Sequence, residues 1–279
     1  MKEDSLENKI ILITGATSGI GKETALKLAN LGKTIIFTAR NAKQGKKTRD
    51  DIRQATNNDE VHMLPCDLSS FKSIRTTCKD FTGKFNRLDV LINNAGIWTK
   101  KRQFSRDGIE MIFAVNYLAP FLMTNLLLDV LIQSKPSRVI NVTSGLHFGT
   151  INFKDIEFKK RFSGMKAYKQ SKLCLILFTR FLAKQLEDTG VSINCISPGM
   201  TKTNLAKETG LMSKVMFELR GKDSCYAAES LIYLAISSNV KNISGEYFTK
   251  NKIKKSSKQS YDMRLAKKLW DLSEEYCKL

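Results

Sequence analysis

The feature that most constrains the fold of this chain is a regular alternation of short apolar runs with longer amphipathic stretches. Runs rich in β-branched residues predict strands, and apolar residues at every third or fourth position predict helices. The predicted strands cover residues 9–15, 34–40, 61–68, 88–96, 137–145, 191–199 and 245–248. The predicted helices cover residues 22–31, 41–55, 71–85, 108–132, 165–188 and 223–237. Alternation of near-continuously apolar strands with helices predicts a parallel sheet covered by helices on both faces.

No linker, repeat or low-complexity tract interrupts this rhythm, so we expect residues 1–279 to form a single domain. The expected fold is α/β, a Rossmann-type doubly wound parallel sheet in three α/β/α layers. Two segments lack clear periodicity, residues 145–164 and 200–222, and both follow predicted strands. Open α/β sheets bind ligands at the carboxyl ends of their strands, so both segments are expected to be substrate loops. A basic segment, residues 250–279, ends the chain.

The net charge of +19 is unusual and is compatible with binding to nucleic acid or to another anionic partner. The lysines, however, are spread along the chain among acids, without a basic helix or an aromatic-interleaved patch. We therefore expect no specific nucleic-acid partner. The densest cluster, Lys250 to Lys258, holds five lysines and no acid. It fits a solvated loop or a weak contact with an anionic surface equally well.

Cysteine usage and the chain's start argue against several other classes of protein. Six cysteines occur singly and only two histidines are present, so neither a metal site nor a disulfide framework is expected. The polar N-terminus resembles neither a signal nor a transit peptide, which predicts a cytoplasmic protein. The longest apolar stretch, residues 117–132, contains Pro120, Asn125 and Asp129 and is shorter than the roughly 20 residues of a spanning helix. It is expected to be a buried helix, not a transmembrane segment.

The stretch TGATSGIG, Thr14 to Gly21, lies between the first predicted strand and the first predicted helix. Glycines there allow a tight turn, and the N–H groups of a helix N-terminus attract an anion such as a pyrophosphate. The spacing of Gly15, Gly19 and Gly21 differs from the common dinucleotide fingerprint G-x-G-x-x-G. The turn alone therefore indicates either a cofactor site or a tight structural turn.

The end of the second predicted strand favours one cofactor over another. NAD-binding folds place an acid there to hold the ribose 2′-hydroxyl, whereas this chain has Arg40. A guanidinium can bind a 2′-phosphate through charge-assisted hydrogen bonds. The residue predicts a preference for NADP(H) over NAD(H), unless Arg40 simply projects into solvent.

Tyr168 and Lys172 are four residues apart, which places them on one face of a predicted helix. A nearby ammonium stabilises a phenolate and lowers the pKa of the phenol, which suits proton exchange with an alcohol or carbonyl oxygen. Ser144, at the end of the preceding strand, can reach the phenol from the sheet edge. The three residues together are candidates for a catalytic set.

These motifs together resemble the short-chain dehydrogenase/reductase family over nearly the whole chain. The matching stretches are TGATSGIG, CDL at 66–68, NNAG at 93–96, Asn116 in FAVNYLAP, Ser144 in NVTSG, YKQSK and SPGMTKT at 197–203. The resemblance implies that Ser144 polarises the substrate oxygen, Tyr168 exchanges its proton and Lys172 binds the nicotinamide ribose. It also implies that Asn116 holds a relay water. The implied cofactor-binding residues are Gly15, Thr17, Ser18, Gly19, Ile20, Gly21, Arg40, Asp67, Leu68, Asn94, Ala95, Gly96, Tyr168, Lys172, Pro198, Gly199, Thr201 and Thr203.

Some of these residues also have structural explanations. NNAG can stabilise the central strand, Asp67 can act as an acid at a helix N-terminus, and Asn116 can kink a helix. Members of the family often pair through two long helices, here 108–132 and 165–188, so the resemblance implies a possible homodimer or homotetramer.

Within the family, stretches such as FTARN, NNAGIW and VNYLAPFLMTNLLL are similar to the retinol dehydrogenase-like branch. The expected function is interconversion of an alcohol and a carbonyl compound with NADP(H). The apolar residues of the two substrate loops favour an apolar small molecule as substrate. His147 is expected in the pocket wall, not as a metal ligand or base. Reduction of a carbon–carbon double bond, or a catalytically idle NADP(H)-binding regulatory protein, are the alternatives.

Overall fold

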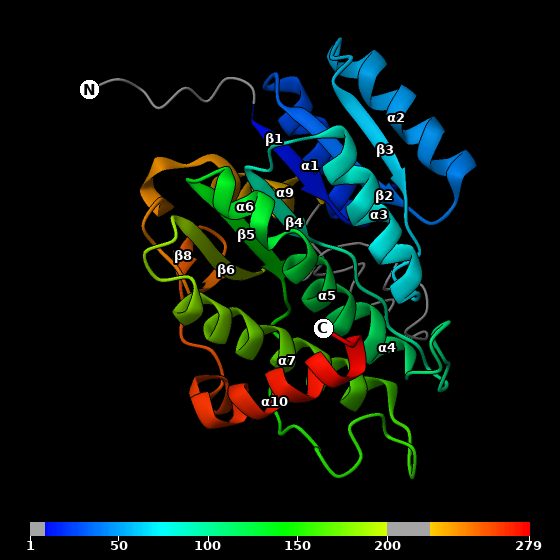
Figure 1. The fold of residues 1–279 in the computed structure, drawn as a ribbon, viewed down its shortest axis with the longest axis vertical. Coiled ribbons are helices and arrows are strands. Elements are labelled where there is room, and N and C mark those ends of the chain that lie inside the picture. Colours follow the sequence, from blue (N-terminus) through cyan, green and yellow to red (C-terminus); the bar gives the residue numbers. More distant parts are fainter. Residues whose placement is uncertain (1–8, 200–223) are drawn as a thin grey trace.

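The central sheet positions every other part of the molecule (Figure 1). A computed structural model describes residues 9–199 and 224–279. Its eight strands are ordered β3-β2-β1-β4-β5-β6-β7-β8, with parallel pairing throughout except between β7 and β8. The strands are β1 Ile10–Ile13, β2 Thr34–Ala39, β3 Val61–Pro65, β4 Val90–Asn93, β5 Ser137–Val142, β6 Val191–Ser197, β7 Tyr247–Thr249 and β8 Lys252–Ile253. The predicted doubly wound parallel sheet is confirmed.

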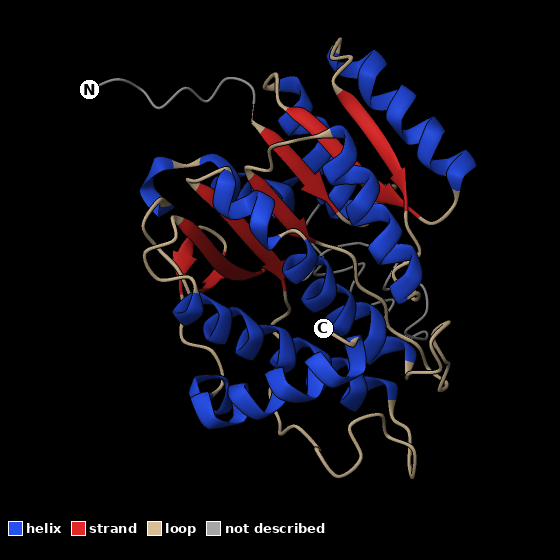
Figure 2. Cartoon of the chain, viewed as in Figure 1, coloured by secondary structure: helices blue, strands red, loops and turns tan. Residues whose placement is uncertain are grey.

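Helices cover both faces of the sheet and give the expected α/β/α layers (Figure 2). One layer contains α1 (Gly19–Asn30), α2 (Ala42–Thr56) and α9 (Ser224–Ile236). The other layer contains α3 (Phe71–Lys84), α4 (Met111–Phe113), the π-helical turn η1 (Ala114–Leu118), α5 (Ala119–Leu126), α6 (Leu128–Gln133), α7 (Gly164–Gln185) and α10 (Met263–Cys277). Two short 3₁₀ turns, η3 (Ser238–Val240) and η4 (Lys258–Tyr261), lie in the C-terminal part.

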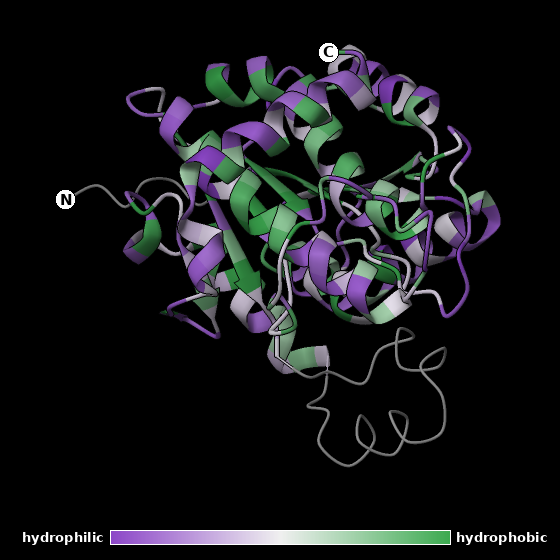
Figure 3. Ribbon diagram, turned by 90° about the horizontal axis from the view of Figure 1, so that it is seen from below, coloured by the Kyte–Doolittle hydropathy of each residue, from purple (hydrophilic) through white to green (hydrophobic). Residues whose placement is uncertain are grey.

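The apolar strands bury side chains on both faces because successive residues point in opposite directions. In β1, Leu12 packs in the cluster under α5 and α7, whereas Ile11 and Ile13 pack in the cluster under α1 and α9. In β2, Ile36 packs in the cluster under α5 and α7, and Phe37 packs in the cluster under α1 and α9. Hydropathy colouring shows the resulting band of apolar strands between the helical layers (Figure 3). This explains why the strands read as continuous apolar runs.

The helix predicted over residues 108–132 is confirmed in part: the chain is helical from Met111 to Gln133, but the π-helical turn η1 lies between α4 and α5, and a break at Leu127 separates α5 from α6. Pro120 has no N–H with which to bond the Asn116 carbonyl, as a regular α-helix requires. The Asn116 side chain instead bonds the backbone of Ile97, at 2.7 Å from its N and 2.9 Å from its O. At the next break, the Asn125 amide donates to the Phe121 carbonyl at 2.8 Å. The missing N–H of Pro120 accompanies the π-helical turn, and the side-chain bond of Asn125 accompanies the break at Leu127.

Helix α10 was not predicted from the sequence. Asp262 caps it by accepting hydrogen bonds from the N–H groups of Arg264 and Leu265, both at 3.0 Å. Its buried residues recur at helical spacing along one face: Ala266, Leu269, Ser273 and Cys277. The ring of Trp270 lies 4.9 Å from that of Phe121 and 6.0 Å from that of Phe178, measured between ring centroids. Helix α10 thus covers part of α5 and α7, the helices through which pairing was expected. The oligomeric state stays a prediction.

Replacing Phe121 by Ala should test this aromatic contact between α10 and the core. Phe121 is fully buried and meets the rings of Tyr117, Phe178 and Trp270. Removing the ring should lower the free energy of unfolding by about 3–5 kcal/mol, measured by chemical denaturation. Phe104→Ala is the matched control, because Phe104 is 55% exposed and should lose less than about 1 kcal/mol. A loss at Phe121 no larger than the control's would contradict the packing described.

Candidate functional site

The glycine turn between β1 and α1 is shaped for close approach of a ligand. Gly15 adopts a φ of +70°, and a Cβ there would lie 2.9 Å from the Ala95 Cα. A Cβ on Gly21 would lie 2.5 Å from the Asn94 Nδ2 and from the Gly15 carbonyl oxygen. Ser18 precedes α1 without a side-chain capping hydrogen bond, so its hydroxyl does not occupy the N–H groups of the first turn. The turn therefore fits a phosphate group at the helix N-terminus.

The end of β4 holds this turn in place. The Asn94 amide donates to the carbonyls of Thr14 and Gly15, at 2.8 and 3.2 Å, and the Thr14 hydroxyl accepts from the N–H groups of Asn94 and Ala95, both at 3.0 Å. Asn93 points the other way and donates to Asn141 of β5 at 2.9 Å. The structural role considered for the NNAG motif is therefore present, since Asn93 links central strands and Asn94 fixes the glycine turn. Contact of the motif with the cofactor stays a prediction.

The other residues predicted to contact the cofactor lie along the same carboxyl edge. Arg40 follows β2 and is exposed, as a partner for a ribose phosphate must be. Asp67 follows β3, where its Oδ1 accepts from the backbone N and hydroxyl of Ser69, at 3.0 and 2.7 Å. One carboxylate oxygen of Asp67 therefore stabilises the turn before α3. The N-cap residue of α3 is Ser70, not Asp67. Pro198 and Gly199 follow β6, and Thr201 and Thr203 lie outside the described residues.

Ser144, Tyr168 and Lys172 meet at this edge. Ser144 follows β5, and its side chain lies close enough to that of Tyr168 on α7 to oppose part of the rise in the Tyr168 pKa. Lys172, one turn further along α7, is 3% exposed, and its Nζ donates to the Val142 carbonyl at 3.0 Å. The same Nζ lies 5.6 Å from the centroid of the Tyr168 ring. The structure therefore brings together the serine, tyrosine and lysine predicted from the sequence.

Burial dominates the proton affinities in this set. It raises the pKa of Tyr168, and the Ser144 side chain opposes part of that rise. Burial also lowers the pKa of Lys172, from 10.5 to about 8, because the ammonium is removed from water. Lowering of the tyrosine pKa by Lys172, as expected from the sequence, stays a prediction for the enzyme with its cofactor bound.

Asn116 lies beside the lysine. A Cβ built on Gly96 would be 3.3 Å from the Lys172 Nζ and 3.6 Å from the Asn116 Oδ1, so this glycine separates the two polar groups without filling the space. The Asn116 amide also donates to the Ser171 hydroxyl at 3.2 Å. Asn116 lies within η1, so the helix irregularity considered for it is present. Its role in holding a relay water stays a prediction.

His147 has a role that sequence reasoning missed. It is 3% exposed, with its Nδ1 2.8 Å from the Ser144 carbonyl and its Nε2 3.1 Å from the backbone N of Ser257. Because Nε2 accepts from an N–H, Nδ1 must carry the proton that bonds Ser144. Burial lowers the pKa of His147, which favours this neutral form. The histidine therefore ties Ser144 to the C-terminal segment, and its contact with Ser257 spans 110 positions, which no local pattern signals.

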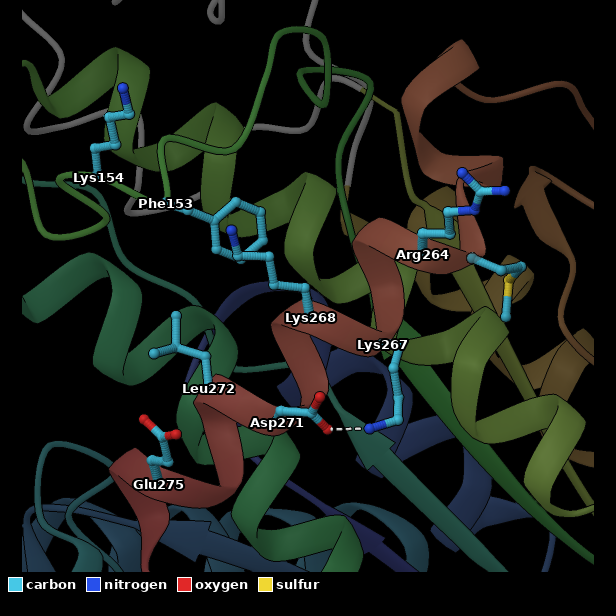
Figure 4. Close-up of a pocket in the computed structure, with 9 residues that line it drawn as sticks. Phe153, Lys154, Arg264, Lys267, Lys268, Asp271, Leu272 and Glu275 are labelled. Carbon is cyan, nitrogen blue, oxygen red and sulfur yellow. Dashed lines mark hydrogen bonds and ion pairs between the residues drawn. The ribbon is translucent and has the colours of Figure 1, made fainter.

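The loop of residues 145–164 has parts at the site and parts away from it. Phe158 and Phe162 pack with Trp98 against Tyr168, whereas Leu146 and Phe148 are exposed near Ser144. Phe153 was expected in the substrate wall, but its ring lies under Lys268, 4.6 Å from its Nζ (Figure 4). A hollow of about 740 Å³ lies there, between residues 153–154 and the outer face of α10, away from Tyr168. The other expected loop, 200–222, lies outside the described residues.

All six cysteines are free, and five of them are buried. Within residues 9–199 and 224–279, no group of three or more His, Cys, Asp and Glu side chains could hold a metal ion. Over the same residues, none of the helices combines the length and apolar character needed to cross a bilayer.

Exchanging Lys172 for Met should stabilise the protein at neutral pH. With a pKa near 8 instead of 10.5, the buried ammonium lowers the free energy of unfolding by about 3 kcal/mol at pH 7. Methionine cannot replace the hydrogen bond of Lys172, so about 1 kcal/mol of the gain is lost again. Above pH 8 the folded wild type releases a proton that its unfolded chain still holds, so wild-type stability rises with pH. The advantage of Lys172→Met, about 1–3 kcal/mol by denaturation at pH 7, should therefore shrink toward pH 10.

Lys169→Met, on the same helix but only partly buried, is the matched control and should show no such pH-dependent gap. A Lys172→Met protein less stable than wild type at pH 7, or a gap that is constant with pH, would contradict the assignment.

Comparison with known proteins agrees with this geometry. The family model described as short chain dehydrogenase matches residues 9–214. Retinol dehydrogenase 13 of Mus musculus is 38% identical over 95% of this chain and 83% of its own length. Retinol dehydrogenase 14 of Homo sapiens is 39% identical over 96% of this chain and 86% of its own length.

Solved structures agree as well. A putative uncharacterized protein from Mycobacterium paratuberculosis superposes with a TM-score of 0.79 at 30% identity, over 97% of this chain and 93% of the other. The RhlG/NADP active-site complex of Pseudomonas aeruginosa superposes with a TM-score of 0.73 at 25% identity, over 88% and 95%. Sequence, fold and site agree, and the chain belongs to the short-chain dehydrogenase/reductase family.

Proposed function

We propose that this protein is an NADP(H)-dependent oxidoreductase that interconverts an apolar alcohol with its aldehyde or ketone. The observation that carries the proposal is the placement of Tyr168 and the buried Lys172 on one face of α7, beside Ser144 at the end of β5. A bound nicotinamide supplies or accepts the hydride. Ser144 then holds the substrate oxygen, and Tyr168 donates a proton to it in reduction or accepts one in oxidation.

The cofactor preference rests on Arg40. It is exposed at the end of β2, where an acid that would repel a 2′-phosphate is absent. The glycine turn lies at the end of the neighbouring strand β1. The 2′-phosphate of NADP(H) and its pyrophosphate would therefore both find suitable partners on one edge of the sheet.

The apolar nature of the substrate rests on the surroundings of Tyr168. Ile112, Trp98, Phe158 and Phe162 pack around it, and Leu146 and Phe148 lie beside Ser144. The relatives named retinol dehydrogenase make an apolar alcohol or aldehyde a reasonable first choice for a substrate panel. A cytoplasmic location, expected from the polar N-terminus, remains part of this proposal.

Two other functions remain as alternatives to be separated by experiment. The same tyrosine and lysine suit reduction of an enone, whereas an idle regulatory protein would bind cofactor without turnover. Purified protein with NADPH should therefore be tested against a panel of aldehydes, ketones and enones, and NADPH consumption measured. Turnover of enones alone would favour the first alternative, and absence of all turnover the second.

Replacing Tyr168 by Phe should remove most of the turnover of whichever substrate the panel identifies. Loss of the proton donor should lower kcat by about 10²–10⁴-fold, with NADPH affinity kept within a few-fold. Tyr233→Phe, on α9 in the other helical layer, is the control and should retain turnover. Equal turnover in Tyr168→Phe and wild type would refute the assigned acid.

Replacing Arg40 by Asp should reverse the cofactor preference. The variant loses charge-assisted hydrogen bonds and adds repulsion, so the Kd for NADPH should rise by about 10–100-fold. NADH affinity should change far less. Lys46→Asp, an exposed cation on α2, is the matched control. Equal affinity of the wild type for NADPH and NADH would overturn the preference.

A further inference from the structure

Three segments of the connections at the carboxyl edge of the sheet carry a large positive charge that has no role in the proposed redox chemistry. They are residues 98–106 after β4, 158–166 after β5 and 250–258 after β7, and we call them the basic rim. The basic rim contains thirteen cations and no acid: Lys100, Lys101, Arg102, Arg106, Lys159, Lys160, Arg161, Lys166, Lys250, Lys252, Lys254, Lys255 and Lys258.

The opposite edge of the sheet differs in charge. The full stretches around the rim segments, residues 94–110, 143–163 and 250–262, contain thirteen cations and five acids. The described connections at the opposite edge, residues 31–33, 57–60, 85–89, 134–136, 186–190 and 237–246, contain four cations and six acids. The charge of +19 is therefore distributed unevenly, with its strongest concentration around the site.

Little of the rim's charge is neutralised within the protein. Arg106 pairs with Asp67 at 3.9 Å, while Arg102 and Lys159 pair with Glu157 at 3.9 and 3.2 Å. Among the residues that the structure describes, the other ten cations of the rim form no ion pair. Their charge is available to a partner.

The rim encloses the catalytic set. Arg102 Nε donates to the Glu157 carbonyl at 3.3 Å, and Trp98 and Phe162 from the first two segments both pack against Tyr168. The third segment reaches the site through Ser257, whose backbone N donates to His147 beside Ser144. A surface bound by the rim would therefore lie near Tyr168 and Ser144.

Each segment of the rim also exposes one large apolar side chain among its cations. Phe104 is 55% exposed, Met165 41% and Ile253 48%. Exposed apolar side chains between cations are typical of surfaces that bind at a membrane interface. The apolar side chains enter the headgroup region, and the cations contact anionic lipids. Nucleic-acid binding by stacking requires several aromatic platforms, and only Phe104 of these three side chains is aromatic.

We propose that the basic rim docks this protein on an anionic phospholipid surface, with Phe104, Met165 and Ile253 inserted among the headgroups. The substrate entrance then opens toward the bilayer, where an apolar alcohol or aldehyde dissolves. This second step rests on the proposed function, whereas docking itself does not.

Docking is tested by co-sedimentation of the full chain with phosphatidylcholine vesicles, with and without phosphatidylserine. Binding should require phosphatidylserine and weaken as salt is added. Each lysine near such a surface contributes about fivefold, so Lys100→Glu with Lys101→Glu should weaken partitioning by at least about 25-fold. Lys79→Glu with Lys84→Glu, exposed lysines of α3 outside the rim, is the matched control and should bind like wild type.

A second variant separates a membrane from other polyanions. Phe104→Ser should weaken vesicle binding while leaving the charge unchanged. Vesicle binding that Phe104→Ser leaves unaltered and that single-stranded RNA displaces at low concentration would assign the rim to nucleic acid and overturn the proposal. Equal sedimentation of wild type and the Lys100/Lys101 variant with anionic vesicles would overturn it as well.

Turnover then distinguishes failure of docking from failure of the proposed function. The Lys100/Lys101 variant should reduce a vesicle-borne long-chain aldehyde more slowly than wild type and reduce a short water-soluble aldehyde at the wild-type rate. Normal turnover of both aldehydes would refute entry from the bilayer. Absence of turnover in the wild type, with vesicle binding intact, would refute the proposed function and leave docking standing.

Discussion

Strands β1 to β7 of the described sheet all run in the same direction, so each connection that follows one of them leaves from one edge. The glycine turn follows β1, Arg40 follows β2, Asn94 follows β4 and Ser144 follows β5. Residues far apart in sequence therefore meet without any special device to gather them. The cofactor cradle, the catalytic set and the basic rim all depend on this single constraint.

Much of the fold and site was predictable because both depend on local patterns. Alternating apolar runs and helical periodicity predict the parallel sheet, and Tyr168 and Lys172 share a helix face by spacing alone. The divided helix at 108–132 was not predictable in the same way, because the Asn116 amide finds its partner in the backbone of Ile97, outside its own helix. The link from His147 to Ser257 and the clustering of the basic rim were hidden for the same reason. Each joins segments that are separate in sequence.

Lys172 illustrates how a functional residue can oppose stability. Its ammonium lies in the interior with a backbone carbonyl as its partner, and no carboxylate of the described residues pairs with it. We expect a cation held there to bind a ribose hydroxyl of the cofactor, whereas the protein without cofactor bears the cost of burying it. Binding of cofactor is therefore expected to relieve some of that cost and to raise the melting temperature of the protein.

The hydrogen bonds of His147 have a consequence for protein engineering. Exchanging residues 145–164 for a loop without a histidine at position 147 would remove the acceptor of the Ser257 N–H and the donor to the Ser144 carbonyl. The recipient's tail and the grafted loop would then no longer match. A chimera built to acquire a relative's specificity needs residues 250–262 from the same parent, because the loop and the tail form one transferable unit.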